Sequence, residues 1–73
     1  MRWIDLPSTE REALARQLTE RQLHVYILRL GGYSWTRISQ DCGIQIRTVR
    51  THHHAAQITH QRIRAQLEQQ EAA

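Results

Sequence analysis

The chain has 73 residues, a formal net charge of +3 and a sequence pI near 10.0. A chain of this length forms one small domain. Its core supplies only about 3–5 kcal/mol of net stability, so we expect a partner chain or ligand to stabilise it further. The single cysteine, Cys42, excludes an intrachain disulfide and a cysteine-based zinc cluster, and the amino end has no apolar run long enough for a signal peptide or a membrane span.

Residues 1–7 precede the first helical pattern and are expected to form an extended arm closed by Pro7. Three apolar side chains are expected to anchor this arm: Trp3, Ile4 and Leu6. Ser8 is a preferred N-cap residue, so we predict a helix from Ser8 to about Gln17. Its apolar side consists of Ala13, Leu14 and Leu18.

A second helix is predicted to follow directly and to end at Leu30. The spacing Thr19-x-x-Gln22 is that of a capping box, which satisfies two of the free N–H groups at a helix start. Four apolar residues spaced i, i+3, i+4 and i+7 mark its buried stripe: Leu23, Tyr26, Ile27 and Leu30. Gly31-Gly32 ends the helix.

The segment from Ser34 to Thr51 has the spacing of two short helices that cross through a tight turn. Ser34 caps the first helix, small Ser39 allows close approach, and Gly43 supplies a turn with positive φ. Three apolar residues point into the crossing: Ile38, Ile44 and Val49. The last helix begins at Ile44 or Gln45, and its free face carries Arg47, Arg50, Thr51 and His54. An arginine-bearing helix on a helical scaffold is how a small domain reaches into the DNA major groove.

Basic residues are concentrated in the same region. From Cys42 to Leu67 there are four arginines and four histidines but no acidic residue. A solvated face would carry mixed signs, so this asymmetry favours nucleic acid as the partner.

The last helix is uninterrupted by Gly or Pro from Gln45 to the end of the chain. Six residues along it form a heptad seam opposite the arginine face: Val49, His53, Ala56, His60, Ile63 and Leu67. The far part of this seam must be buried either by the amino-terminal helix or by a second copy. We favour a homodimer through Ala56, His60, Ile63 and Leu67.

These elements predict an all-α fold, a small helical bundle with a helix-turn-helix and an extended C-terminal helix. A single domain is expected over residues 1–73. Within it, residues 1–7 form the arm, residues 8–56 the helix-turn-helix head and residues 57–73 the helical extension.

The histidines do not have the spacing of a metal site. No two of His52, His53, His54 and His60 are three or four residues apart, and His53 lies about 10.5 Å from His60 along a helix. Cys42 lies where a helix-turn-helix places a packing residue, and nothing resembles paired catalytic carboxylates or a phosphate-cradling loop. We therefore predict a non-enzyme without a metal or cofactor.

The region from Leu18 to Ala56 carries a longer motif. It reads Leu18-Thr19-x-Arg21-Gln22-x-x-Val25, followed by Gly32-x-Ser34-x-x-x-Ile38-Ser39-x-x-x-Gly43-Ile44-x-x-x-Thr48-Val49-Arg50-Thr51. This motif resembles the helix-turn-helix shared by LuxR-type response regulators and region 4 of bacterial sigma factors, and it covers about half the chain. One departure is His53, which stands where the family has a buried Leu or Val.

The resemblance implies a free-standing head whose recognition helix, at about residues 45–56, reads DNA in the major groove. It assigns base or phosphate contacts to Gln45, Ile46, Arg47, Arg50 and Thr51, with Thr48 at a phosphate-side or capping position. His54 is expected to meet a phosphate.

The leading hypothesis is a sequence-specific DNA-binding transcription regulator whose partner is double-stranded DNA. An adaptor that binds RNA polymerase or a sigma factor is an alternative, because sigma region 4 also docks on polymerase. A small terminase-type DNA-recognition subunit is a third interpretation. Each is expected in the cytoplasm of a bacterial or phage-infected cell, with no membrane partner.

Overall fold

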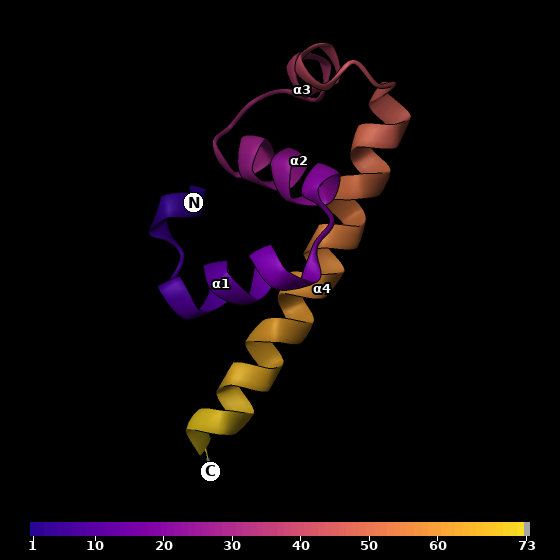
Figure 1. Cartoon of the computed structure of the whole chain (residues 1–73). Helices are drawn as coiled ribbons and strands as arrows, with labels where there is room; N and C mark the ends of the chain where they lie inside the picture. The colour runs from indigo at the N-terminus through magenta and orange to yellow at the C-terminus, as the bar shows by residue number, and fades with distance from the viewer. Residues whose placement is uncertain (73) are drawn as a thin grey trace.

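The computed structural model describes residues 1–72, with side chains to residue 70, and contains four α-helices (Figure 1). A 3-10 turn, η1 (Trp3–Asp5), precedes α1 (Ser8–Gln17), α2 (Glu20–Leu30), α3 (Trp35–Cys42) and α4 (Ile46–Ala72). The molecule measures 44 × 19 × 15 Å, and α1, α2 and α3 each pack on the long helix α4. The described residues contain no strand, so the predicted all-α bundle is confirmed. Residue 73, the end of the predicted extension, lies outside the described residues.

The predicted side-chain caps at the starts of α2 and α3 are both present. The capping box is confirmed: the Thr19 hydroxyl accepts from the Gln22 N–H at 3.1 Å, and the Thr19 N–H donates to Gln22 Oε1 at 3.1 Å. The Ser34 hydroxyl accepts from the Arg37 N–H at 3.1 Å, so the cap of α3 is also confirmed.

The predicted N-cap at Ser8 is wrong. Ser8 is the first residue of α1, and the capping position is taken by Pro7, which makes no side-chain hydrogen bond. The Pro7 carbonyl accepts from the Arg11 N–H at 3.1 Å. A helix can begin on a backbone carbonyl alone, so α1 starts one residue earlier than the serine hydroxyl suggested.

The first seven residues are not a fully extended arm, because η1 forms a short turn within them. The Arg2 N–H donates to the Asp5 carboxylate at 3.1 Å, which closes this turn. Leu6 is buried and Trp3 packs on the core, as expected for anchors. Ile4 is 66% exposed and is not an anchor.

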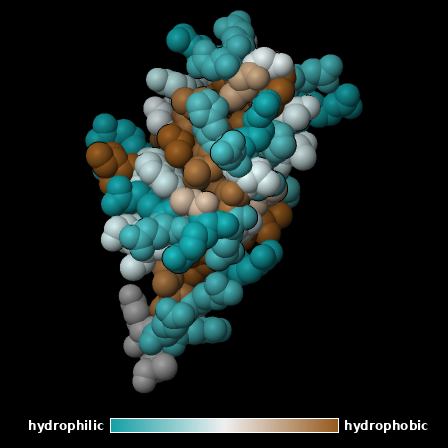
Figure 2. Space-filling view, in the orientation of Figure 1, coloured by the Kyte–Doolittle hydropathy of each residue, from teal (hydrophilic) through white to brown (hydrophobic). Residues whose placement is uncertain are grey.

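The apolar core consists of two clusters that α2 and α4 both join. One contains Leu6, Leu14, Leu18, Tyr26, Ala56 and Ile63. The other lies between α2, α3 and α4 and contains Val25, Ile38 and Val49, all 0% exposed. Figure 2 shows hydrophobic atoms gathered in the middle of the molecule, with hydrophilic atoms toward the end of α4.

The buried face of α2 is broader than the predicted stripe. Tyr26 is buried and Leu23 and Leu30 pack against the first cluster, whereas Ile27 is only partly buried. Val25, which was not predicted, is fully buried on the α3 side. α2 therefore has two buried faces, one packed in the cluster that includes α1 and the other in the cluster that includes α3.

The heptad seam of α4 faces the core as predicted, but it is covered within the chain. Ala56, His60 and Ile63 are 0%, 5% and 1% exposed, because α1, α2 and the first residues of the chain pack over them. Leu67 packs on the edge of the same cluster. The prediction that these four residues form a homodimer interface is therefore corrected. Their surface is covered by α1 of the same chain.

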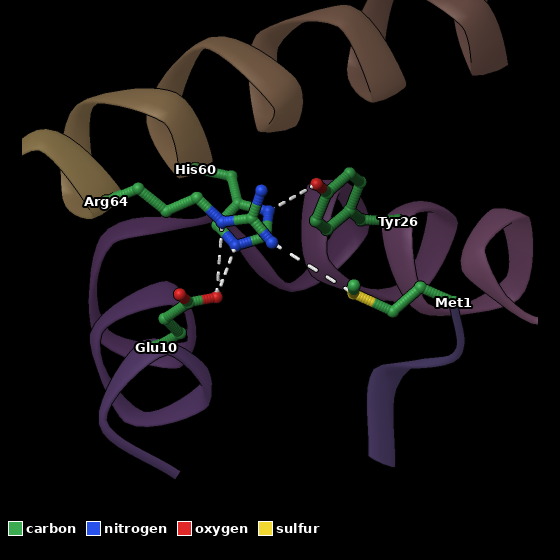
Figure 3. A network of polar contacts seen from close by, with 5 residues as sticks. All are labelled: Met1, Glu10, Tyr26, His60 and Arg64. Carbon is green, nitrogen blue, oxygen red and sulfur yellow. Dashed lines mark hydrogen bonds and ion pairs between the residues drawn. The ribbon is translucent and has the colours of Figure 1, made fainter. Parts of the chain in front are cut away.

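A buried polar network ties three helices together at this seam (Figure 3). The Tyr26 hydroxyl on α2 lies 2.6 Å from Nδ1 of His60 on α4, and His60 Nε2 lies 2.9 Å from the Glu10 carboxylate on α1. Because a carboxylate only accepts, His60 donates its Nε2–H to Glu10 and, when neutral, accepts from Tyr26. Arg64 approaches the same Glu10 oxygen at 3.5 Å.

The charges of this network follow from its surroundings. Burial by itself raises the pKa of Glu10, but the hydrogen bond from His60 and the charge of Arg64 outweigh it and leave that pKa below its ordinary value. Burial raises the pKa of the Tyr26 phenol. Glu10 is thus an anion held at the amino-terminal end of α1, where the helix dipole also favours negative charge.

Candidate nucleic-acid interface

The turn between α3 and α4 positions the start of the last helix. Gly43 has φ 66° and ψ 30°, the left-handed conformation predicted for it. The Ser39 carbonyl accepts from the N–H groups of Gly43 and Ile44, at 2.9 and 3.2 Å. The Ser39 hydroxyl donates to the Ile44 carbonyl, so Ser39 closes the turn as well as allowing close approach. α4 then begins at Ile46, slightly later than predicted.

The crossing of α3 and α4 rests on the second apolar cluster. Ile38 and Val49 are fully buried against Val25 of α2, and Ile44 and Cys42 pack at the edge. Cys42 is a partly buried free thiol, which fits the packing site predicted for it. This core fixes the angle at which the first turns of α4 stand out from the molecule.

The predicted site residues lie together on the outer face of α4 and the turn before it. Thr48 is partly buried, and the others are exposed: Gln45, Ile46, Arg47, Arg50, Thr51 and His54. Neither Arg47 nor Arg50 pairs with a carboxylate among the described side chains, and the first turn of α4 contains no acidic residue. Both guanidinium groups are therefore available to an anion.

Thr51 has an internal hydrogen-bond partner. Its hydroxyl donates to the Arg47 carbonyl one turn earlier, at 3.0 Å. Its proton is thus engaged within the helix, and the hydroxyl oxygen is left to act as an acceptor.

Two residues outside the predicted set belong to the same surface. An open groove is lined by Arg29 from the end of α2 and Trp35 from the start of α3, together with Arg47, Arg50 and His54 of α4. The Arg29 guanidinium carbon lies 4.1 Å from the centroid of the Trp35 ring, and that of Arg50 lies 5.8 Å from it. Periodicity along one helix cannot reveal this cluster, because its members come from three helices.

His53 forms the inner wall of this groove. It is half-buried, and its ring centroid lies 5.1 Å from that of Trp35 and 5.6 Å from that of Tyr26. Burial lowers the pKa of His53, and the charges of Arg29 and His54 lower it further. A neutral imidazole with aromatic partners explains how histidine occupies an otherwise apolar seam position.

Neither the groove around His53 nor the buried network of His60 has the form of a reactive centre. Among the side chains that the structure describes, no three His, Cys, Asp or Glu residues could hold one metal ion. His60 and Tyr26 are each 5% exposed, so the network with Glu10 is closed to a substrate and acts as an internal tie. No helix in the described residues is long and apolar enough to cross a membrane.

Comparison with known proteins gives one family. Residues 12–56, more than half of the chain, match the family described as Sigma-70, region 4, a helix-turn-helix domain. The match begins within α1, contains α2 and α3, and ends in the first half of α4, so it includes the turn and the arginine face. No curated protein and no solved structure matches the chain.

Proposed function

The chain belongs to the sigma-70 region 4 family, whose members are non-enzymatic, DNA-binding helix-turn-helix domains, and from this premise we propose that it is a sequence-specific DNA-binding transcription regulator. In this proposal the first half of α4 is the recognition helix, and double-stranded DNA is the partner. The sigma branch of the resemblance is the one that the family match supports.

The observation that carries the proposal is the exposed arginine face on a rigidly held helix. Arg47 and Arg50 lie one turn apart on the exposed side of α4, whereas Val49 between them is buried, and neither arginine forms an ion pair with a carboxylate among the described side chains. The major groove is about 12 Å wide and admits an α-helix. Each arginine suits either a guanine edge or a backbone phosphate, because its planar fork donates two parallel hydrogen bonds.

Ile46 gives this face an apolar contact as well. It opens α4 and is 42% exposed, although Ile44, two residues earlier, packs on the core. An exposed apolar side chain at the tip of a recognition helix suits the methyl group of thymine. Gln45 beside it carries an amide, which can donate to and accept from an adenine edge.

The test is DNA binding by fluorescence anisotropy on a mixed-sequence duplex at low and near-physiological salt. Wild type is compared with Arg47→Ala/Arg50→Ala and with Arg16→Ala/Arg62→Ala, which removes equal charge from exposed positions elsewhere. We expect salt-sensitive binding that the first double variant loses and the second largely retains. No binding of the folded protein at low salt, or an equal loss in both variants, would contradict the proposal.

The family supports a second function, an adaptor that binds RNA polymerase or a sigma factor. The same titration separates the two, because an adaptor of this kind need not bind free duplex. Folded protein that ignores DNA but is retained by immobilised polymerase would favour the adaptor.

A further inference from the structure

The groove beside the recognition helix has a titratable side chain in its inner wall. His53 is half-buried there, with its ring centroid 5.1 Å from that of Trp35 and 5.6 Å from that of Tyr26. The seam of α4 is apolar on either side of it, since Val49 and Ala56 are both fully buried. Packing alone would be served by Leu or Val at this position. The imidazole adds a group that can gain a proton near neutral pH.

The surroundings of His53 oppose that proton in the free chain. Five side chains face it from three helices: Tyr26 and Arg29 of α2, Trp35 of α3, and Arg50 and His54 of α4. The two arginines are cations, and burial raises the pKa of the Tyr26 phenol, so that ring is neutral. Burial, followed by the charges of Arg29 and His54, lowers the pKa of His53.

The groove also has no internal counterion for a protonated imidazole. No carboxylate is among the described residues that line it. Glu10, the carboxylate of the buried network, is held by His60 and Arg64. A negative charge that would stabilise protonated His53 must therefore come from a ligand.

A duplex bound at the recognition face supplies this negative charge. The groove is continuous with that face, because Arg47 and Thr51 line it together with His53. DNA carries one negative charge per about 1.7 Å of helix axis, and the Debye length at physiological salt is about 8 Å, so several of these charges act on the groove. Docking also removes water from the imidazole, which opposes its charge. That effect is the smaller one, because His53 is already half-buried in the free chain.

We propose that binding of duplex DNA is coupled to uptake of a proton by His53, so that the chain holds DNA more tightly in mildly acid than in neutral solution. This inference rests on the proposed function. The free chain disfavours the proton and the complex favours it. Affinity therefore rises as the pH falls through the range in which His53 is protonated in the complex but not in the free chain, and it levels off at lower pH.

The experiment measures duplex affinity by fluorescence anisotropy at constant ionic strength, from about pH 8 to about pH 5.5. Wild type is compared with His53→Leu, with His53→Gln and with the control His24→Gln, which removes an exposed histidine outside the groove. We expect the wild-type affinity to rise about three- to tenfold toward acid, with a slope of no more than about one log unit per pH unit for one proton.

The variants assign that rise to one side chain. Both His53→Leu and His53→Gln should lose most of it, because neither side chain takes up a proton in this range. His24→Gln should keep all of it. His54→Gln should keep most of it, because His54 is exposed and solvent screens the charges around it. Circular dichroism at each pH confirms that every chain is folded.

Proton NMR gives a readout that does not depend on affinity. The ring C–H signals of His53, identified by their absence from His53→Gln, are followed over the same pH range in the free chain and in the saturated complex. We expect the midpoint of the His53 titration to move to higher pH in the complex, and that of His24 to move clearly less. A His53 midpoint that the duplex leaves unmoved would overturn the coupling.

The two proposals fail in different ways. If wild type binds no duplex at low salt at any pH in the series, the proposed function itself fails. If wild type binds, and both His53 variants keep its dependence of affinity on pH, DNA binding stands and only the coupling to His53 is refuted.

Discussion

Replacing Glu10 by alanine should destabilise this protein more than the same change at an exposed acidic residue such as Glu12. Glu10 is the acceptor for His60, and the two side chains are 12% and 7% exposed. The substitution removes the only carboxylate that His60 contacts among the described side chains. It leaves a donor N–H enclosed by α1, α2 and α4.

The magnitude follows from that geometry. Leaving a buried donor without an acceptor costs about 1–3 kcal/mol, and the lost bond at 2.9 Å was to a charged group, which belongs to the upper half of that range. The Arg64 contact at 3.5 Å adds less than about 1 kcal/mol, because 47% of the Arg64 side chain is exposed. The expected loss of about 2–3 kcal/mol is about two fifths or more of the ~3–5 kcal/mol typical for a chain of this size.

The assay is urea unfolding followed by far-ultraviolet circular dichroism at neutral pH. Glu10→Ala should lower the free energy of unfolding by about 2–3 kcal/mol, and the melting temperature by about 10–20 °C. Glu10→Gln should lose less, because its amide oxygen still accepts from His60. The control is Glu12→Ala on the exposed side of α1. If Glu10→Ala and Glu12→Ala agree within about 0.5 kcal/mol, the network does not stabilise the fold as described.

Acid gives an independent check on Glu10. Its pKa in the folded chain is below the ordinary 4.5, through the hydrogen bond from His60 and the charge of Arg64, despite the opposing effect of burial. Such a group contributes stability that is present above 4.5 and is lost as the pH falls through the lower folded value. Wild type should therefore lose its excess stability over Glu10→Ala in that acid range, and an unchanged difference there would contradict this linkage.

Three further predictions concern stability in urea. Gly43→Ala should lower the free energy of unfolding by about 1–2 kcal/mol, because φ at Gly43 is 66°. This cost comes from the backbone alone, since no atom lies within 4 Å of an added Cβ. Gly31 has a negative φ, so Gly31→Ala should cost clearly less. Thr19→Ala should lower the free energy of unfolding by about 1 kcal/mol, because it removes the side-chain cap of α2. The control Thr9→Ala removes no such cap and should leave the free energy of unfolding nearly unchanged. Burial, aided by the charges of Arg29 and His54, lowers the pKa of His53 below its ordinary 6.5. Its contribution to stability is therefore present above pH 6.5 and is lost as the pH falls through the lower folded value, so His53→Leu should remove this part of the acid dependence of the free energy of unfolding.

Features that depend on neighbouring residues were predictable from the sequence. The capping box of Thr19 and Gln22, the cap at Ser34 and the left-handed Gly43 each follow from chemistry within a few residues, and the structure has all three. The exposed arginine face was predictable for a similar reason, because helical periodicity turns Arg47 and Arg50 away from the seam that contains Val49. Whether these residues contact DNA stays a prediction.

Features that depend on where the helices pack could not be predicted. The spacing of Val25 does not show that α2 has a second buried face, since that face exists only once α3 has folded back. Nothing near Glu10 indicates that its partner is His60, fifty residues later. The stack of Arg29 on Trp35 depends on the path of the glycine turn between their helices. For the same reason the seam could not be assigned to α1 rather than to a second chain.

The tie between Glu10 and His60 also orders events during synthesis on the ribosome. α1 is translated before its packing surface, because the part of α4 that covers its apolar side, including His60 and Ile63, lies about fifty residues later in the chain. Until that part of α4 has emerged, Leu14 and Leu18 have no complete partner surface, so the apolar side of α1 stays uncovered. Chains stalled at increasing lengths through an added carboxy-terminal linker should therefore resist protease only once His60 and Ile63 have left the exit tunnel.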